Sequence, residues 1–239
     1  MKRNLLLFSM LLTVTMLSAQ EQWFGVQVGF AEPILRQNIT TLNRKLSDVT
    51  RGNGFKVGFA YDVTLIEGFG LNVAINYSYA HRGGKWVAEN PMFPNNFQTR
   101  ETFSMHMVEL PIEWQYKFNI ANDTWLILYT GPTLQYNFAY NTTTTRRNTI
   151  TNEEKTEKIN HYSTDIDNDG VRDYTPFNIQ WGVGAGFQYK NYYIRGGYNF
   201  GIYNHFRDNF NDKGSYTNRA RFDEWNIRLG FYFLNFGVD

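Results

Sequence analysis

Residues 108–118 read VELPIEWQYKF, and apolar and polar side chains alternate through the whole stretch. The apolar positions hold Val, Leu, Ile, Trp, Tyr and Phe, and the positions between them include two Glu, one Gln and one Lys. A period of two places successive side chains on opposite faces of an extended chain, whereas a helix repeats every 3.6 residues. The stretch therefore predicts a long β-strand with one apolar face and one polar face.

The same alternation recurs in seven other segments, which gives eight predicted strands. Besides 108–118, the predicted strands are 24–30, 55–63, 71–79, about 124–140, 179–189, 192–202 and 225–233. The strand at 124–140 is less regular, because Trp125, Ile127 and Tyr129 put bulky side chains on its otherwise small or polar face. The connections alternate between long ones (32–53, 82–103, 141–176 and 203–222) and short ones (66–70, 119–123 and 190–191). Short periplasmic turns alternating with long outer loops are typical of a membrane barrel, with both termini on the periplasmic side.

Alternation alone leaves two interpretations, because the apolar face can meet lipid or can line the cavity of a soluble, lipocalin-like carrier of apolar ligands. The polar face is rich in Gly, Ala, Asn, Gln and Ser, which suits the tight interior of an eight-stranded barrel. Aromatic residues also gather near the strand ends, as in an interfacial girdle. We therefore predict an all-β fold, an eight-stranded antiparallel up-and-down transmembrane β-barrel, and keep the soluble carrier as an alternative.

The composition excludes several classes of protein. Aromatic residues make up 18% of the 239 residues, yet the mean hydropathy is −0.46, which is too polar for a helical membrane protein. The formal net charge of +1 supplies no global field to attract nucleic acid. Without cysteine the chain has no disulfide, no thiolate metal site and no cysteine nucleophile.

The N-terminus has the pattern of an export signal. Lys2 and Arg3 precede an apolar segment at 5–17, and Ser18 and Ala19 supply the small residues before a cut. The apolar segment is too short to span a bilayer as a helix. We predict a signal peptide at 1–19, a single outer-membrane β-barrel domain at 20–239 and a location in the outer membrane.

The predicted inner face carries charged residues: Lys56, Asp62, Glu109, Glu113, Lys117, Arg195 and Arg228. Because charges removed from water must be paired, we expect Glu109 and Glu113 to pair with some of Lys56, Arg195 and Arg228. Such a network would fill and rigidify the narrow lumen. The alternative is a proton path or a gated pore.

The longest loop contains the motif DIDNDGVRD at 165–173, which resembles the start of a calcium loop. Asp165, Asp167, Asp169 and Asp173 supply carboxylates at positions 1, 3, 5 and 9, and Gly170 permits the sharp turn. The Glu expected at position 12 is missing. The motif suggests Ca²⁺ in the 141–176 loop as the one candidate cofactor, and a plain polar turn is the alternative.

No sequence motif indicates an enzyme. His81, His106, His161 and His205 have no metal-ligand spacing, and no nucleophile elbow or phosphate loop occurs. We expect a monomer in contact with outer-membrane lipid, with no nucleic-acid partner. The long loops could bind secretion-system or surface proteins.

Residues 108–118 and 129–134 also resemble two strands of the PorT-like outer-membrane β-barrel proteins, the "LE-x-P…KY-x-F" strand and the "GP" strand that follows it. The resemblance extends loosely over the mature chain and implies the barrel fold and the outer membrane. The founding member of that family is an accessory protein of the type IX secretion system, so this role is an alternative to a structural or surface-binding one. Pro111 and Pro132 lie in neighbouring strands and cannot donate to the ladder, so we expect a bulge or an unpaired site there.

Overall fold

The computed structural model describes residues 21–41, 44–89, 96–163, 174–206 and 219–236. The predicted signal peptide lies outside these residues. The strands are β1 (Glu21–Thr41), β2 (Arg44–Arg51), β3 (Asn53–Ile66), β4 (Phe69–Arg82), β5 (Val87–Ala88), β6 (Phe97–Ala121), β7 (Thr124–Asn148), β8 (Glu154–Asn160), β9 (Phe177–Tyr189), β10 (Tyr192–Gly201) and β11 (Arg219–Asn235). Within the described part of the chain, no helix has the length and apolar character needed to cross a bilayer.

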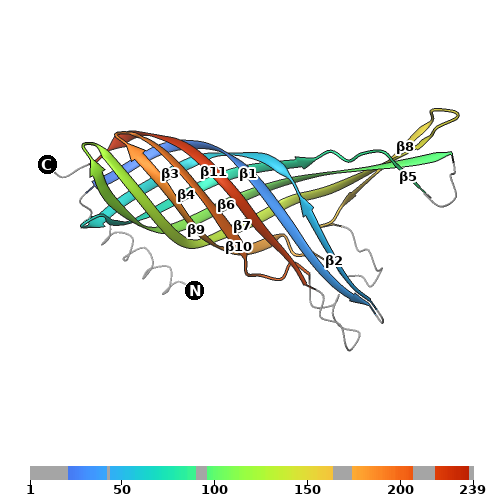
Figure 1. Cartoon of the computed structure of the whole chain (residues 1–239), viewed down its shortest axis with the longest axis horizontal. Coiled ribbons are helices and arrows are strands. Elements are labelled where there is room, and N and C mark those ends of the chain that lie inside the picture. Colours follow the sequence, from blue (N-terminus) through green and yellow to red (C-terminus); the bar gives the residue numbers. More distant parts are fainter. Residues whose placement is uncertain (1–20, 42–43, 90–95, 164–173, 207–218, 237–239) are drawn as a thin grey trace.

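Eight of the strands form a closed antiparallel ring (Figure 1). Their order around the ring is β6-β4-β3-β1-β11-β10-β9-β7, and pairing between β6 and β7 closes it. Each strand of the ring pairs with its neighbour in sequence, and β1 pairs with β11. The eight-stranded up-and-down prediction is confirmed.

The two ends of the barrel differ. One end, here called the turn end, holds the short hairpins after β3, β6 and β9, where β1 begins and β11 ends. The first of these hairpins places Glu67 at φ 46° and Gly68 at φ 84°. Two successive left-handed residues match the right-handed twist of the flanking strands. The three short connections predicted from the sequence are confirmed.

The other end, here called the loop end, is built from strand extensions that the sequence analysis treated as loops (Figure 1). β1 continues to Thr41 and forms a hairpin with β2, and β7 continues to Asn148 and pairs with both β6 and β8. The prediction of a loop at 141–176 is wrong for 141–148 and 154–160, which lie in β7 and β8. Residues 142–145 are four consecutive Thr, a β-branched type that favours strands. Both faces of this extension are polar, so it lacks the apolar alternation that marks the barrel.

The bulky apolar face of the ring points outward. Val28, Phe59 and Trp225 are 57%, 52% and 53% exposed, respectively. The soluble-carrier alternative, which needs this face inside, is therefore wrong. Ile127 and Tyr129 of β7 are the exceptions predicted from the sequence, and both are buried inside the barrel. Tyr129 fits there because a Cβ atom on Gly184 would lie 2.3 Å from its ring.

The prolines of β6 and β7 leave an unpaired site without a bulge. The ladder between these strands pairs Pro111 with Thr133 and resumes at Trp114 with Thr130, in unchanged register. Register shifts of this pair lie elsewhere, after His106 and after Asn119. Of the two expected outcomes, a bulge or an unpaired site, the unpaired site is the one that the structure confirms.

Candidate functional site

All five residues predicted for the lumen network lie inside the barrel, each at most 5% exposed. Lys56 of β3 donates to the carboxylates of both Glu109 of β6 and Glu224 of β11. Glu113 of β6 accepts from Arg228 Nη2 at 2.6 Å and from Arg195 Nη1 at 3.2 Å. These charges therefore join four strands that are separated in sequence, β3, β6, β10 and β11.

Asp62 and Lys117 extend this network toward the turn end. Lys117 Nζ donates to Asp62 Oδ1 at 2.7 Å, and Arg195 Nη2 donates to Asp62 Oδ2 at 2.8 Å. The hydroxyl of Tyr232 also donates to Asp62, at 3.0 Å. The sequence analysis assigned Asp62 and Lys117 to the inner face but not to a pair, and it missed Glu224. Glu224 was detectable, because it directly precedes the outward-facing Trp225.

The lumen network is neutral and nearly fills the space around it. It contains four cations (Lys56, Lys117, Arg195 and Arg228) and four carboxylates (Asp62, Glu109, Glu113 and Glu224). A cavity of about 10 Å³ remains between Lys56, Glu109 and Arg228, room for about one water molecule. This arrangement leaves no room there for a solute to pass.

An apolar layer closes the loop end of the lumen. It consists of Leu35, Ala80, Phe103, Met105, Met107, Tyr140, Tyr162, Tyr174, Phe206, Ala220 and Phe222. His205 lies four residues after Gly201, the end of β10, and outside the membrane-spanning strands. It is fully buried against the Phe222 ring at a centroid distance of 4.5 Å. Its Nδ1 lies 2.6 Å from the carbonyl oxygen of Thr175. Burial lowers the pKa of His205 to about 4.

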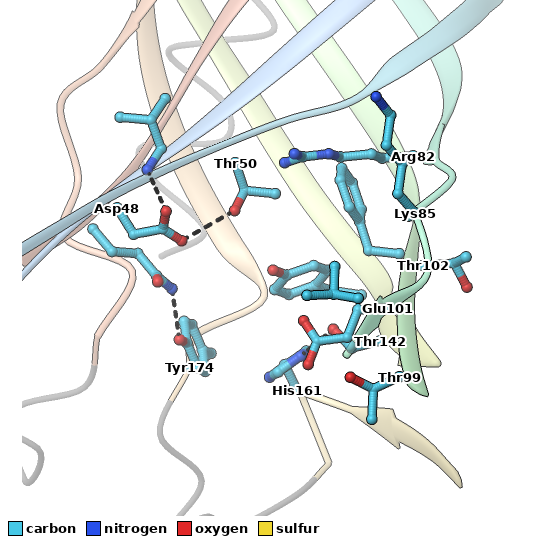
Figure 2. Close-up of a pocket in the computed structure, with 16 residues that line it drawn as sticks. Asp48, Thr50, Arg82, Lys85, Thr99, Glu101, Thr102, Thr142, His161 and Tyr174 are labelled. Atoms are coloured by element: carbon cyan, nitrogen blue, oxygen red, sulfur yellow. Dashed lines mark hydrogen bonds between the residues drawn. The ribbon is translucent and has the colours of Figure 1, made fainter. Parts of the chain in front are cut away.

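Above the apolar layer, the mouth of the barrel forms a pocket of about 690 Å³. We call it the mouth pocket. Its lining is Gln37, Asp48, Val49, Thr50, Arg82, Gly84, Lys85, Val87, Thr99, Glu101, Thr102, Phe103, Tyr140, Thr142, His161 and Tyr174. In Figure 2, Asp48 and Tyr174 lie on one side, and Lys85 and Thr99 lie on the other.

Part of the lining is held in place by hydrogen bonds. Gln37 Nε2 donates to the Tyr174 hydroxyl at 2.8 Å, and the Thr50 hydroxyl donates to Asp48 at 3.3 Å (Figure 2). Thr142 Oγ1 lies 2.8 Å from His161 Nε2. The His161 ring also stacks on Tyr140, with centroids 4.4 Å apart. The floor of the mouth pocket is therefore aromatic and well ordered by its neighbours.

Three charged side chains of the lining remain open to a ligand. The side chains of Arg82, Lys85 and Glu101 make no hydrogen bond or ion pair with any residue that the structure describes. The mouth pocket therefore offers two cations, the carboxylates of Glu101 and Asp48, and several hydroxyls above aromatic rings. Residues of β1, β2, β4, β5, β6 and β7 and of the segments between strands make this pocket, and the sequence analysis did not find it.

No cluster of metal-ligating side chains is evident in the described ranges. No group of three or more His, Asp or Glu residues there could hold a metal ion. Asp165, Asp167, Asp169 and Asp173 lie outside the described residues, so the calcium hypothesis stays a prediction. His106 Nδ1 lies 2.8 Å from the hydroxyl of Tyr77 on the outer face, and His205 is bound to a backbone carbonyl.

Comparison with known proteins identifies one family and several solved barrels. The family described as "Outer membrane protein beta-barrel domain" matches residues 18–212. A comparison with curated proteins gives no match.

Three of the similar solved structures are outer-membrane barrels. Ail of Yersinia pestis, in complex with the heparin analogue sucrose octasulfate, is 14% identical with a TM-score of 0.38, over 90% of this chain and 99% of that chain. Neisserial surface protein A is 14% identical with a TM-score of 0.40, over 88% and 97%. The outer membrane protease OmpT of Escherichia coli is 10% identical with a TM-score of 0.33, over 90% and 98%.

Proposed function

Because the chain belongs to the outer membrane protein beta-barrel domain family, we propose that it is a surface-binding protein of the outer membrane. In this proposal the barrel is a membrane anchor that does not conduct solutes, and the mouth pocket holds a small polar ligand. The observation that carries the proposal is the pocket of about 690 Å³ lying above a filled lumen. No enzyme family is indicated for the chain.

The filled lumen favours binding over transport. A solute moving along the axis would have to displace the apolar layer at Phe103 and Tyr140, and then the ion pairs of Glu113. Breaking a buried ion pair costs about 3–5 kcal/mol. Interiors of eight-stranded barrels are just wide enough for side chains to fill. We therefore expect no ion or sugar conductance.

The size and chemistry of the mouth pocket suit a ligand with several polar groups. Its volume falls in the range of about 300–1,000 Å³ that is typical of small-molecule sites. Arg82 and Lys85 can meet an acidic group, and Glu101 can meet an amine or hydroxyl donor. Tyr140 and Tyr174 are buried in the floor of the pocket, where they give the ligand a rigid base. A short peptide or a glycan bearing a carboxylate has this combination.

We further propose that the loop end faces the outside of the cell and that both termini are periplasmic. Short periplasmic turns and long extracellular loops are the rule for outer-membrane barrels. The lipid-facing ring has no free strand edge, which favours a monomer in contact with lipid alone. Crosslinking in vesicles that yields a defined dimer would contradict the monomer.

Binding is tested with the folded barrel in lipid nanodiscs. The probes are an array of tetrapeptides and acidic oligosaccharides, and the readout is retention measured by mass spectrometry. A Thr50→Trp variant should lose retained probes by filling the mouth pocket, whereas Thr151→Trp, at an exposed turn, should keep them. Equal retention by both variants, or no retention by the unchanged protein, would overturn the proposal.

An accessory role in type IX secretion is a second hypothesis, supported by the resemblance of residues 108–118 and 129–134 to the PorT-like strands. That role requires a protein partner at the membrane. Mild detergent extraction followed by affinity purification tests it, because stoichiometric co-purification of secretion components is expected only in this case.

A further inference from the structure

Three arginines lie together on the outer wall of the barrel near its loop end. Arg36 of β1 is the cross-strand partner of Arg221 of β11, and Arg51 of β2 is the partner of Ile34. Side chains of a strand alternate between faces, so Arg221 shares the outward face of the lipid-exposed Trp225. We call Arg36, Arg51 and Arg221 the arginine patch.

The burial of Ile34 shows how tightly the arginine patch is packed. Ile34 lies on the same outward face as Arg36, yet it is only 1% exposed. Long arginine side chains can cover apolar surface with their methylene stems while the guanidinium stays in a polar environment. Such stems beside Ile34 would account for its burial.

The carboxylates near the patch neutralise only part of it. Asp223 is 2% exposed and accepts from Arg36 Nε at 2.7 Å and from the Tyr198 hydroxyl at 2.9 Å. Arg221 Nε lies 3.8 Å from the same carboxylate, beyond hydrogen-bond distance. Glu32 pairs with Arg51 at 3.2 Å.

Some guanidinium N–H donors of the arginine patch therefore have no carboxylate partner. Three guanidinium groups face two carboxylates, and Arg221 forms no hydrogen bond with any side chain in the described ranges. Like charges directly opposite each other on one sheet face are destabilising. The side chains of Arg36, Arg51 and Arg221 are 36%, 60% and 42% exposed, so their free donors are accessible. An anion between them would remove the repulsion.

We propose that the arginine patch binds the phosphate of a membrane lipid headgroup. The patch begins where the lipid-facing band ends: Phe30, Phe55 and Trp225 are the last exposed aromatics of their strands on this side. Acyl chains packed against these rings bring a headgroup to the level of the arginines. Arginine is suited to phosphate because its planar group donates two parallel hydrogen bonds.

The test uses the full barrel folded in a neutral detergent and titrated with phosphatidic acid, with binding followed by native mass spectrometry. The Arg51→Gln/Arg221→Gln variant keeps the Arg36–Asp223 pair, so it should fold. We expect phosphatidic acid to bind this variant about 30-fold more weakly than the unchanged protein. Each arginine near an anionic headgroup raises the affinity about fivefold, and the variant lacks two of them. The single Arg221→Gln variant, which breaks no hydrogen bond, should show a smaller loss in the same direction.

Three controls distinguish a lipid-phosphate site from a general effect of charge and from binding of free phosphate. Lys155→Gln/Lys158→Gln removes the same charge from exposed positions of β8 and should leave binding unchanged. Phosphatidylcholine should bind weakly, since its phosphate carries a compensating cation. Inorganic phosphate should not compete at equal concentration. Loss of binding in the β8 variant, equal binding of phosphatidylcholine, or full competition by inorganic phosphate would each overturn the lipid site.

Discussion

Replacing Lys56 with Met tests whether the lumen network holds the barrel together. The ammonium group of Lys56 contacts both Glu109 and Glu224, and all three side chains are at most 4% exposed. Methionine keeps most of the volume but leaves two buried carboxylates without a cation. Breaking a buried pair from one side costs about 3–5 kcal/mol. The cavity of about 10 Å³ beside these groups admits one water molecule at most and cannot restore their solvation.

The assay is urea-induced unfolding from lipid vesicles, followed by tryptophan fluorescence and by the heat-dependent mobility of the folded band on gels. Lys56→Met should lower the free energy of unfolding by about 4 kcal/mol. Adding Glu109→Gln and Glu224→Gln should recover much of this loss, because neutral amides tolerate burial better than carboxylates. The control Lys155→Met, at an exposed position of β8, should change the free energy of unfolding by less than about 0.5 kcal/mol. A Lys56→Met barrel as stable as the original, or a triple variant no better than the single one, would refute the reasoning.

Three further predictions concern other parts of the chain. His205 has a folded pKa of about 4 against an ordinary value of 6.5, so the neutral form stabilises the fold above pH 6.5. About 3 kcal/mol should be lost as the pH falls from 6.5 to 4, a slope that His205→Gln removes in unfolding curves measured at each pH. Gly68→Ala should cost about 1–2 kcal/mol, because φ is 84° and its Cβ would meet the carbonyl oxygen of Lys117, whereas Gly83→Ala, with open space around its Cβ, should be neutral in the same assay. If 165–173 is a calcium loop, isothermal titration should show binding that Asp167→Asn/Asp169→Asn abolishes; identical heats for both proteins would leave only a polar turn.

The barrel could be predicted from sequence because each of its strands carries its own evidence. Alternation in 108–118 identifies a strand and its two faces without reference to any neighbour. The short turns were equally local, since a two-residue hairpin such as Glu67-Gly68 depends on its own backbone angles. Even the bulky inner residue Tyr129 could be placed, because it interrupts a pattern that is otherwise regular.

The loop end and the mouth pocket could not be predicted in this way. The extension of β7 is polar on both faces, so its Thr-rich sequence resembles a loop unless the pairing with β6 and β8 is known. Asp48 of β2, Glu101 of β6 and His161, directly after β8, line the same pocket only because these three segments come together at the loop end. The charges of the lumen were recognisable one at a time, but their partners depend on how the strands are staggered around the ring. Glu224 was missed for a simpler reason, since the last predicted strand began one residue after it.

The lumen network also has a consequence for how the barrel is assembled. The partners of Glu113 lie 82 and 115 residues further along the chain, and those of Lys56 lie 53 and 168 residues away. These contacts exist only when β1 and β11 meet in the observed register. A ring closed with one strand too few, or with a strand slipped by two residues, would bury several of the same charges without partners. The lumen network therefore stabilises only a ring that has the correct number of strands in the correct register.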